Sequence, residues 1–280
     1  MSYSAEINRN NPTCFLFLVD QSRTMLDPFG ATPDITKSQG VADAINNLIR
    51  TIVLRSSRGQ EGIRDYFYLG VIGYGATVES GLGGKLAGQG LVPISEIGKK
   101  PLRVDRRTKK VSDGAGGILE ETVKFPIWLE PTGNGKTPMC KALELAREVI
   151  VAFLSAFPDC FPPTVINITD GQSTDGDPRA NAEKLRDVGS TDGKTLLFNA
   201  HITSDTGAKP ILYPNDKSQI TDEHARLLFD MSSTLPSLMR ETAPASLEIK
   251  DGARGFLYNT DLVSVIELLD IGTRRDRNMQ

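Results

Sequence analysis

The chain has 280 residues, which is long for one average domain but suits a single α/β domain that carries insertions. Hydrophobic residues make up 39% and charged residues 24%, as in a globular protein with a sizeable core, so a disordered chain is excluded. The net charge of -3 predicts no general electrostatic attraction to nucleic acid or to a membrane surface.

The N-terminal segment and the cysteines indicate the compartment. Residues 1–12 lack the basic start and the apolar stretch of a signal peptide, and the apolar runs of the chain are too short to span a bilayer. Cys14, Cys140 and Cys160 are odd in number and have neither metal-ligand nor redox spacing. Two of them lie in segments predicted to be core, where a reduced thiol acts as a small hydrophobic group. We therefore expect a cytoplasmic protein.

Apolar runs predict strands that alternate with helices along the chain. Residues 14–19 form an unbroken apolar run that ends at Asp20, which is typical of a strand buried on both faces. Further strands are predicted over 66–72, 164–169, 195–202 and 255–258, and helices over 41–53, 139–153, 178–188, 221–231 and 261–270. This alternation predicts an α/β fold: a Rossmann-like, doubly wound, mostly parallel sheet of six strands with helices on both faces.

Residues 79–124 interrupt the alternation. The segment begins rich in glycine and then carries a basic run between Lys99 and Lys110. We predict an insertion that contains a hairpin, with residues 102–111 as its most strand-like part. The core of a single domain, residues 1–280, then covers about 13–78 and 125–272. The basic run is interpreted as a solvated face of the hairpin, because charge runs usually face water, with a partner-binding surface as the alternative.

Two of the predicted buried strands end in aspartates that small polar or flexible residues follow. Residues 20–24 supply a carboxylate and two hydroxyls at alternating positions, from Asp20, Ser22 and Thr24, and Asp170 supplies a second carboxylate. In open α/β sheets, ligand sites form at the carboxyl ends of the strands. Hard cations prefer oxygen ligands, and no His or Cys stands nearby in these motifs. The sequence therefore favours Mg²⁺, with Mn²⁺ as the alternative, over Zn²⁺.

A third candidate ligand is Thr137. We predict that it is the N-cap of the following helix and that Pro138 takes the first helical position, which would place the Thr137 hydroxyl at a strand-to-helix turn. A helix N-terminus repels a cation. Both aspartates are therefore expected to be needed to offset that repulsion.

The order of these motifs resembles the metal-ion-dependent adhesion site (MIDAS) of von Willebrand factor type A (VWA) domains. The family pattern is Asp-x-Ser-x-Ser, then a Thr, then an Asp, on successive loops of a Rossmann-like sheet, and the order of the predicted elements matches over most of the chain. The resemblance implies a metal held directly by the three hydroxyls and partly through water by the two carboxylates, with an Asp or Glu of a protein partner completing the shell. The implied metal ligands are Asp20, Ser22, Thr24, Thr137 and Asp170.

This chain departs from the family pattern at two positions. Thr24 stands where the family has its second Ser, which keeps the hydroxyl and adds a methyl group. Arg23 replaces the usual Gly, and its positive charge is expected to tune partner choice or to weaken metal binding mildly.

The function that the resemblance implies is recognition without catalysis. We expect a divalent-metal-dependent protein–protein interaction module, acting as an adaptor or scaffold and not as an enzyme. Within the family the chain is similar to stand-alone cytosolic bacterial members, including those similar to tellurium-resistance-associated proteins. This similarity predicts a role in a bacterial stress or defence system.

A P-loop nucleoside triphosphatase is the main alternative. It would use Lys136, Thr137 and Asp170, because the Gly-Lys-Thr at 135–137 resembles the end of a Walker A loop and the strand before Asp170 resembles a Walker B strand. The Walker A pattern needs a glycine at position 130, where the chain has Glu130.

Two further interpretations are a phosphatase, which concerns the first motif, and a purely structural role for all the motifs. A phosphatase of the haloacid dehalogenase type would use Asp20 and Thr24, but Ser22 stands where that mechanism needs its acid/base carboxylate. A purely structural interpretation makes the aspartates caps of local turns and the hydroxyls local hydrogen bonders.

Overall fold

The computed structural model describes residues 3–29, 32–57, 59, 62–112, 118–204, 207, 209–244 and 247–259. The predicted closing helix over 261–270 lies outside these residues. That residues 1–280 form a single domain therefore stays a prediction.

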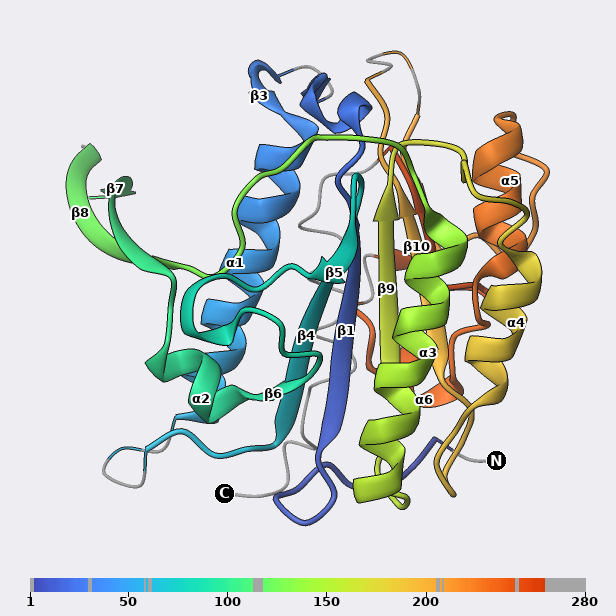
Figure 1. The fold of residues 1–280 in the computed structure, drawn as a ribbon, viewed down its shortest axis with the longest axis horizontal. Helices are drawn as coiled ribbons and strands as arrows, with labels where there is room; N and C mark the ends of the chain where they lie inside the picture. Colours follow the sequence, from blue (N-terminus) through green and yellow to red (C-terminus); the bar gives the residue numbers. More distant parts are fainter. Residues whose placement is uncertain are drawn as a thin grey trace.

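A mostly parallel sheet forms the centre of the fold (Figure 1). Its strand order is β11-β12-β10-β9-β1-β4-β5, and β6 also pairs with β4. The parallel strands are β1 (Thr13–Asp20), β4 (Phe67–Tyr74), β9 (Thr164–Thr169), β10 (Leu196–His201) and β12 (Phe256–Tyr258). The short antiparallel edge strands are β5 (Val78–Ser80), β6 (Val92–Pro93) and β11 (Ile211–Leu212). The predicted α/β architecture is confirmed, and these short edge strands bring the described strands of the sheet to eight.

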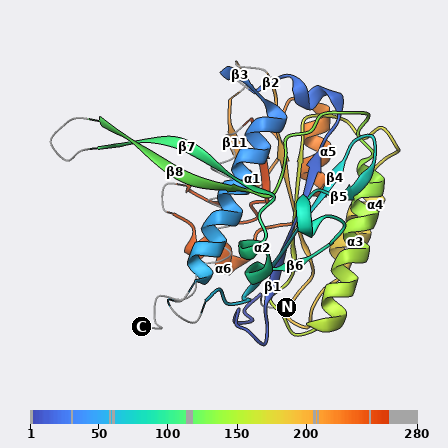
Figure 2. The same ribbon diagram turned by 60° about the vertical axis from the view of Figure 1, so that its left-hand side comes forward.

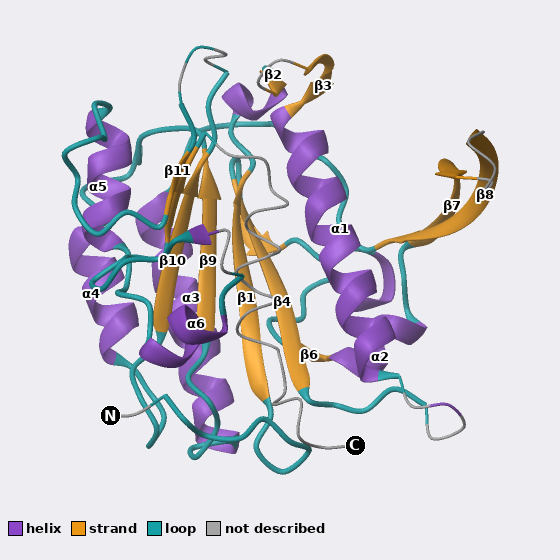
Figure 3. Cartoon of the chain, turned by 180° about the vertical axis from the view of Figure 1, so that it is seen from behind, coloured by secondary structure: helices purple, strands orange, loops and turns teal. Residues whose placement is uncertain are grey.

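Helices cover both faces of the sheet (Figures 1 and 3). One face carries α3 (Met139–Ala156), α4 (Arg179–Asp187) and α5 (Glu223–Met231), and the other carries α1 (Lys37–Ser56), α2 (Ile94–Lys99) and α6 (Ser237–Thr242). Strand β1 serves both cores: Leu16 and Leu18 pack beneath α3, while Phe15 and Phe17 pack beneath α1. Burial on both sides explains why the apolar run of β1 has no alternating polar residues.

The predicted insertion divides into two parts with different positions in the fold. Its first part, through Lys99, belongs to the central sheet and to the core beneath α1 and α2. It contains β5, β6, the 3-10 helix η3 (Gly84–Leu86) and α2, and Leu82, Leu86 and Ile97 are fully buried in it. Apolar residues spaced between the glycines pack this part of the insertion onto the sheet.

The second part is the predicted hairpin. Strands β7 (Arg103–Ser112) and β8 (Ile118–Ile127) pair only with each other in the described sheets, and they project away from the body of the protein (Figure 2). Arg107, midway along β7, joins the hairpin to α1: it lies 2.6 Å from the carboxylate of Asp43 and 3.8 Å above the ring of Phe125. Trp128, directly after the hairpin, is buried and donates its indole N–H to the carbonyl of Ile97 at 2.8 Å.

A smaller unpredicted unit lies between β1 and α1. It consists of the 3-10 helix η1 (Arg23–Leu26) and the two-stranded pair of β2 (Pro28–Phe29) and β3 (Thr32–Thr36), at the end of the sheet where β1 and β9 terminate (Figure 1). Thr36 then caps α1, because its hydroxyl accepts the N–H of Gln39 at 3.2 Å. Among the described residues, no helix has both the length and the apolar character that crossing a membrane requires.

Candidate metal site

Asp20 is the last residue of β1 and lies fully buried at the carboxyl edge of the sheet. One carboxylate oxygen accepts the backbone N–H of Ser22 at 2.8 Å, and the other accepts the hydroxyl of Thr169, the last residue of β9, at 2.6 Å. Burial raises the pKa of Asp20 to about 6, although these hydrogen bonds lower it. Among the described residues, Asp20 has no ion pair to stabilise its charge.

The two hydroxyls after Asp20 join the second aspartate. The Ser22 and Thr24 hydroxyl oxygens are 3.1 Å apart, and the Thr24 hydroxyl donates to Asp170 Oδ1 at 2.9 Å. Thr24 and Asp170 are 146 positions apart in the sequence. The parallel pairing of β1 with β9 brings their carboxyl ends together, so the first two motifs share one edge of the sheet.

Thr137 adjoins these motifs from a third loop. Its side chain is buried, and its backbone is paired with Thr174 in the loop after β9: the N–H of Thr137 donates to the Thr174 hydroxyl at 3.0 Å, and the N–H of Thr174 donates to the Thr137 carbonyl at 2.9 Å. A Cβ placed on Gly171 would lie 4.0 Å from the Thr137 hydroxyl oxygen. All three predicted motifs therefore meet beside the Asp170–Gly171 turn.

Two glycines allow the loops to approach this closely. Gly135 has a φ of +86°, and a Cβ at this position would lie 2.5 Å from the backbone nitrogen of Ala76. A Cβ at Gly75 would lie 2.5 Å from the carbonyl oxygen of Asn134 and 2.6 Å from that of Gln21. A side chain at Gly135 would push the loop that carries Thr137 away from the turn after β4, and a side chain at Gly75 would also press against the loop after β1.

The start of α3 differs from the prediction. Pro138 and not Thr137 is the N-cap, and the helix is capped from another loop: the two carboxylate oxygens of Asp175 each lie 3.0 Å from a backbone nitrogen, one of Cys140 and one of Lys141. Burial raises the pKa of Asp175, but the hydrogen bonds to its carboxylate outweigh this effect and lower the pKa overall. The negative charge of Asp175 offsets the repulsion that the helix end would exert on a nearby cation.

Lys37 is a part of the site that the sequence analysis missed. It is the first residue of α1 and only 5% exposed, and its Nζ lies 2.7 Å from Asp170 Oδ2. The same nitrogen lies 3.5 Å from the carbonyl oxygen of Thr24 and 3.9 Å from the carboxylate of the exposed Asp27. No sequence signal distinguishes Lys37 from a surface lysine, because its partner Asp170 is 133 positions away.

Asn46 is a second residue that the sequence analysis missed. It lies in the middle of α1, fully buried, and its amide oxygen accepts the backbone N–H groups of Trp128 and Leu129 at 2.8 and 3.0 Å. Its amide nitrogen donates to the Leu129 carbonyl at 2.9 Å. Asn46 thus holds the segment that leads from the hairpin to Thr137. The only sequence signal is a polar residue beside the apolar positions of the helix.

The P-loop alternative does not fit this geometry. The first-turn N–H groups of α3 that a phosphate would use already bind the carboxylate of Asp175. The segment with Lys136 and Thr137 follows hairpin strand β8, which lies outside the central sheet, whereas a P-loop follows a strand of the sheet.

The donor set of the site fits a hard cation. Among the described residues, no three His, Cys, Asp or Glu side chains are grouped so that they could hold a metal ion. The site instead offers two carboxylates and three hydroxyls from three loops, and such oxygen donors suit Mg²⁺ or Mn²⁺, which commonly keep several waters in their shells.

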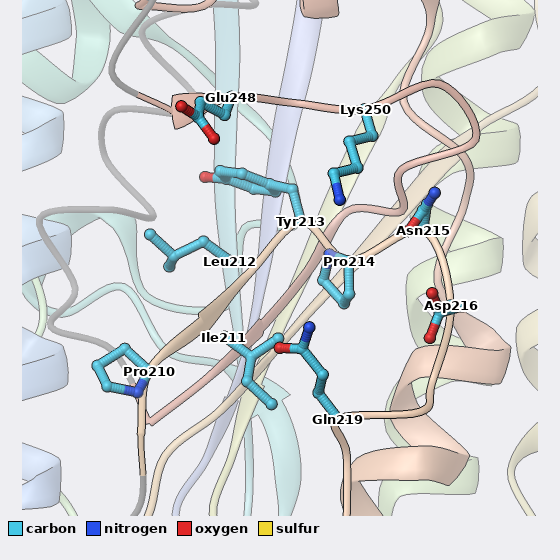
Figure 4. Close-up of a pocket in the computed structure, with 10 residues that line it drawn as sticks. All are labelled: Pro210, Ile211, Leu212, Tyr213, Pro214, Asn215, Asp216, Gln219, Glu248 and Lys250. Atoms are coloured by element: carbon cyan, nitrogen blue, oxygen red, sulfur yellow. The ribbon is translucent and has the colours of Figure 1, made fainter.

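A separate hollow lies at the β11 edge of the sheet (Figure 4). Residues 210–216 line it, together with Gln219, Glu248 and Lys250. It shares no residue with the candidate metal site.

The sheet, its two helical layers and the three loops that meet at the carboxyl ends of β1 and β9 define a Rossmann-like α/β fold, in which the order of the motifs resembles that of VWA domains. No protein-family model and no curated protein sequence matches the chain. Three similar solved structures differ in how much of their own length the chain spans.

A von Willebrand factor type A structure from Catenulispora acidiphila is 13% identical, with a TM-score of 0.40, and the match covers 68% of this chain and 33% of that one. Proximal thread matrix protein 1 from the mussel byssus, with a zinc-occupied MIDAS motif, is 15% identical, with a TM-score of 0.46 and coverage of 94% and 47%. Manganese-loaded TRAP protein from Plasmodium vivax is 16% identical, with a TM-score of 0.43 and coverage of 93% and 72%. The chain thus spans less than half of the first two structures.

Proposed function

We propose that this protein binds a divalent cation, Mg²⁺ or Mn²⁺, and uses it to bind a carboxylate of a protein partner. Ser22, Thr24 and Thr137 would contact the cation directly, while Asp20 and Asp170 would act partly through water. An Asp or Glu of the partner would complete the shell.

The observation that carries the proposal is the meeting of three loops around Asp170. The hydrogen bond of 2.9 Å from Thr24 to Asp170 joins the first and third motifs. Thr137 exchanges two hydrogen bonds with Thr174, one with its hydroxyl and one with its backbone N–H, and these join the second motif to the loop that follows Asp170. Local caps would not require residues so far apart in sequence to converge.

The burial of Asp20 is a second, independent support. A buried carboxylate without a cationic partner destabilises a fold unless something compensates its charge. A divalent cation at this edge would supply the missing positive charge.

The proposal assigns recognition and no reaction. The adaptor or scaffold role, the cytoplasmic location and the place in a bacterial stress or defence system stay predictions that rest on the family resemblance. Phosphate release from ATP or p-nitrophenyl phosphate that Asp20→Ala abolishes would contradict the proposal.

Thermal melting with and without Mg²⁺ tests the metal. A ligand at about 100 times its dissociation constant stabilises the folded state by about 2.7 kcal/mol. For a chain of this size we expect a rise in melting temperature of roughly 5 °C for the wild type. Asp20→Ala and Thr137→Ala are expected to lose most of this rise. Asp177→Ala, which removes an exposed carboxylate from the loop after β9, is the matched control and should keep it.

A pull-down in Mg²⁺ and in EDTA tests the partner. Retention of a partner should require both Mg²⁺ and the wild-type Asp20. A partner retained equally in EDTA would show that binding does not use the cation.

A further inference from the structure

Lys37 places a positive charge inside the proposed metal site. The Lys37 and Asp170 side chains are 6% and 1% exposed, and 2.7 Å separates the ammonium nitrogen from the carboxylate oxygen. Lysine is almost never this deeply buried without an ionic partner. Lys37 also stands at the first position of α1, where the positive end of the helix disfavours a cation. The negative charge of Asp170 therefore offsets both the burial of the Lys37 ammonium and its repulsion by the positive end of α1.

Both oxygens of Asp170 are engaged by this chain. Oδ1 accepts the Thr24 hydroxyl at 2.9 Å, and Oδ2 accepts the Lys37 ammonium at 2.7 Å. A cation that contacts the Thr24 hydroxyl oxygen still leaves its proton directed at Asp170. The carboxylate can thus support the cation through Thr24 while it remains paired with Lys37.

The charges of the site leave an excess when a divalent cation is bound. Asp20 and Asp170 supply two negative charges, which would neutralise a divalent cation by themselves. Lys37 cancels one of them, so the loaded site keeps one net positive charge. Asp27 adds little, because its side chain is 57% exposed and 3.9 Å from the Lys37 nitrogen.

Building on the proposed function, we infer that Lys37 is an internal counter-cation that shares Asp170 with the metal. The Lys37 charge weakens binding of the metal when no carboxylate ligand is present. It also leaves the metal-bound site with one net positive charge, which one further carboxylate would neutralise. A carboxylate ligand then binds cooperatively with the metal. By linkage, the metal and the carboxylate each raise the affinity of the other by the same factor. Lys37 thereby favours occupation of the site when a partner is present.

Titration with Mn²⁺, followed by the electron paramagnetic resonance signal of the free ion, tests the inference. Lys37→Met removes the charge and keeps the length of the side chain, and it should bind Mn²⁺ at least about tenfold more tightly than the wild type, since one full charge is removed from a buried site. Lys37→Arg keeps the charge and should stay within about threefold of the wild type. The matched control is Lys194→Met, which removes an exposed lysine that is also 2.7 Å from an aspartate.

A second measurement uses acetate as the carboxylate. At constant ionic strength, replacing chloride by acetate should raise the Mn²⁺ affinity of the wild type at least about threefold, and that of Lys37→Met less, because the variant lacks the excess charge. If acetate does not change the Mn²⁺ affinity of the wild type, the proposed cooperativity is wrong. The acetate titration of the wild type needs no substitution, so it tests the inference even if Lys37→Met fails to fold.

Asp20→Ala distinguishes failure of the proposed metal site from failure of the role inferred for Lys37. If Asp20→Ala binds Mn²⁺ as the wild type does, the proposed site is wrong and the inference about Lys37 falls with it. If Asp20→Ala abolishes binding and a folded Lys37→Met binds no more tightly than the wild type, only the inference about Lys37 is overturned.

Discussion

Asp20→Asn is expected to stabilise the metal-free protein and to destabilise the metal-loaded protein relative to the wild type. The substitution removes the buried charge and keeps the size of the side chain. The amide oxygen can still accept the N–H of Ser22, and the Thr169 hydroxyl has an alternative acceptor in the carbonyl of Gly171, 3.3 Å away. The free energy of unfolding should therefore report mainly on the charge.

The magnitude follows from the pKa of Asp20. Burial raises this pKa from 3.8 to about 6, which corresponds to about 3 kcal/mol at neutral pH. Below pH 3.8 the folded and unfolded states both hold the proton, so Asp20 has no effect. Between pH 3.8 and 6 only the folded state holds it, and the metal-free wild type loses stability as the pH rises. Above pH 6 the full loss persists until a cation neutralises the carboxylate.

Thermal or urea unfolding in EDTA and in Mg²⁺ checks this prediction. In EDTA at pH 7.5 we expect Asp20→Asn to be more stable by about 2–3 kcal/mol, and the difference should vanish toward pH 4. In saturating Mg²⁺ the order should reverse, because only the wild type gains binding energy. Asp177→Asn, at an exposed aspartate, should show no reversal. A wild type that is already the more stable protein in EDTA at pH 7.5 would refute the reasoning.

Three further substitutions test how the site is held. Asp175→Ala removes the cap of α3 and should cost about 1–2 kcal/mol in urea unfolding. The control Asp187→Ala removes only an exposed ion pair with Lys194 and should cost less than half of that. Gly135→Ala should lower the free energy of unfolding by about 2 kcal/mol or more and weaken Mg²⁺ binding, because the φ of Gly135 is +86° and a Cβ there would lie 2.5 Å from Ala76 N. An unchanged melting temperature and an unchanged response to Mg²⁺ would contradict this close approach of the two loops. Asn46→Ala should lower the free energy of unfolding by about 2–4 kcal/mol, since three backbone groups of Trp128 and Leu129 lose their hydrogen-bond partner. A loss under about 1 kcal/mol in urea unfolding would show that other contacts hold the segment between the hairpin and Thr137.

The alternation of apolar runs predicted the parallel strands of the sheet and the helices α1, α3, α4 and α5, but not the short core helices α2 and α6. The buried strand over 14–19 and the helix over 41–53 lie within β1 and α1 as the structure has them. Local spacing carries this information because each element buries a face of fixed period. The first part of the insertion was interpreted less well, since its frequent glycines hid the apolar residues that pack it against the core.

The sequence by itself determined which oxygen-bearing side chains end the buried strands, because a carboxylate directly after an apolar run is visible in any single chain. Only the tertiary structure decided what surrounds them. Lys37 reaches Asp170 across 133 positions, and Asp175 takes over the helix cap predicted for Thr137. Such contacts depend on which loops the parallel strand order brings to one edge, and no local pattern encodes that order.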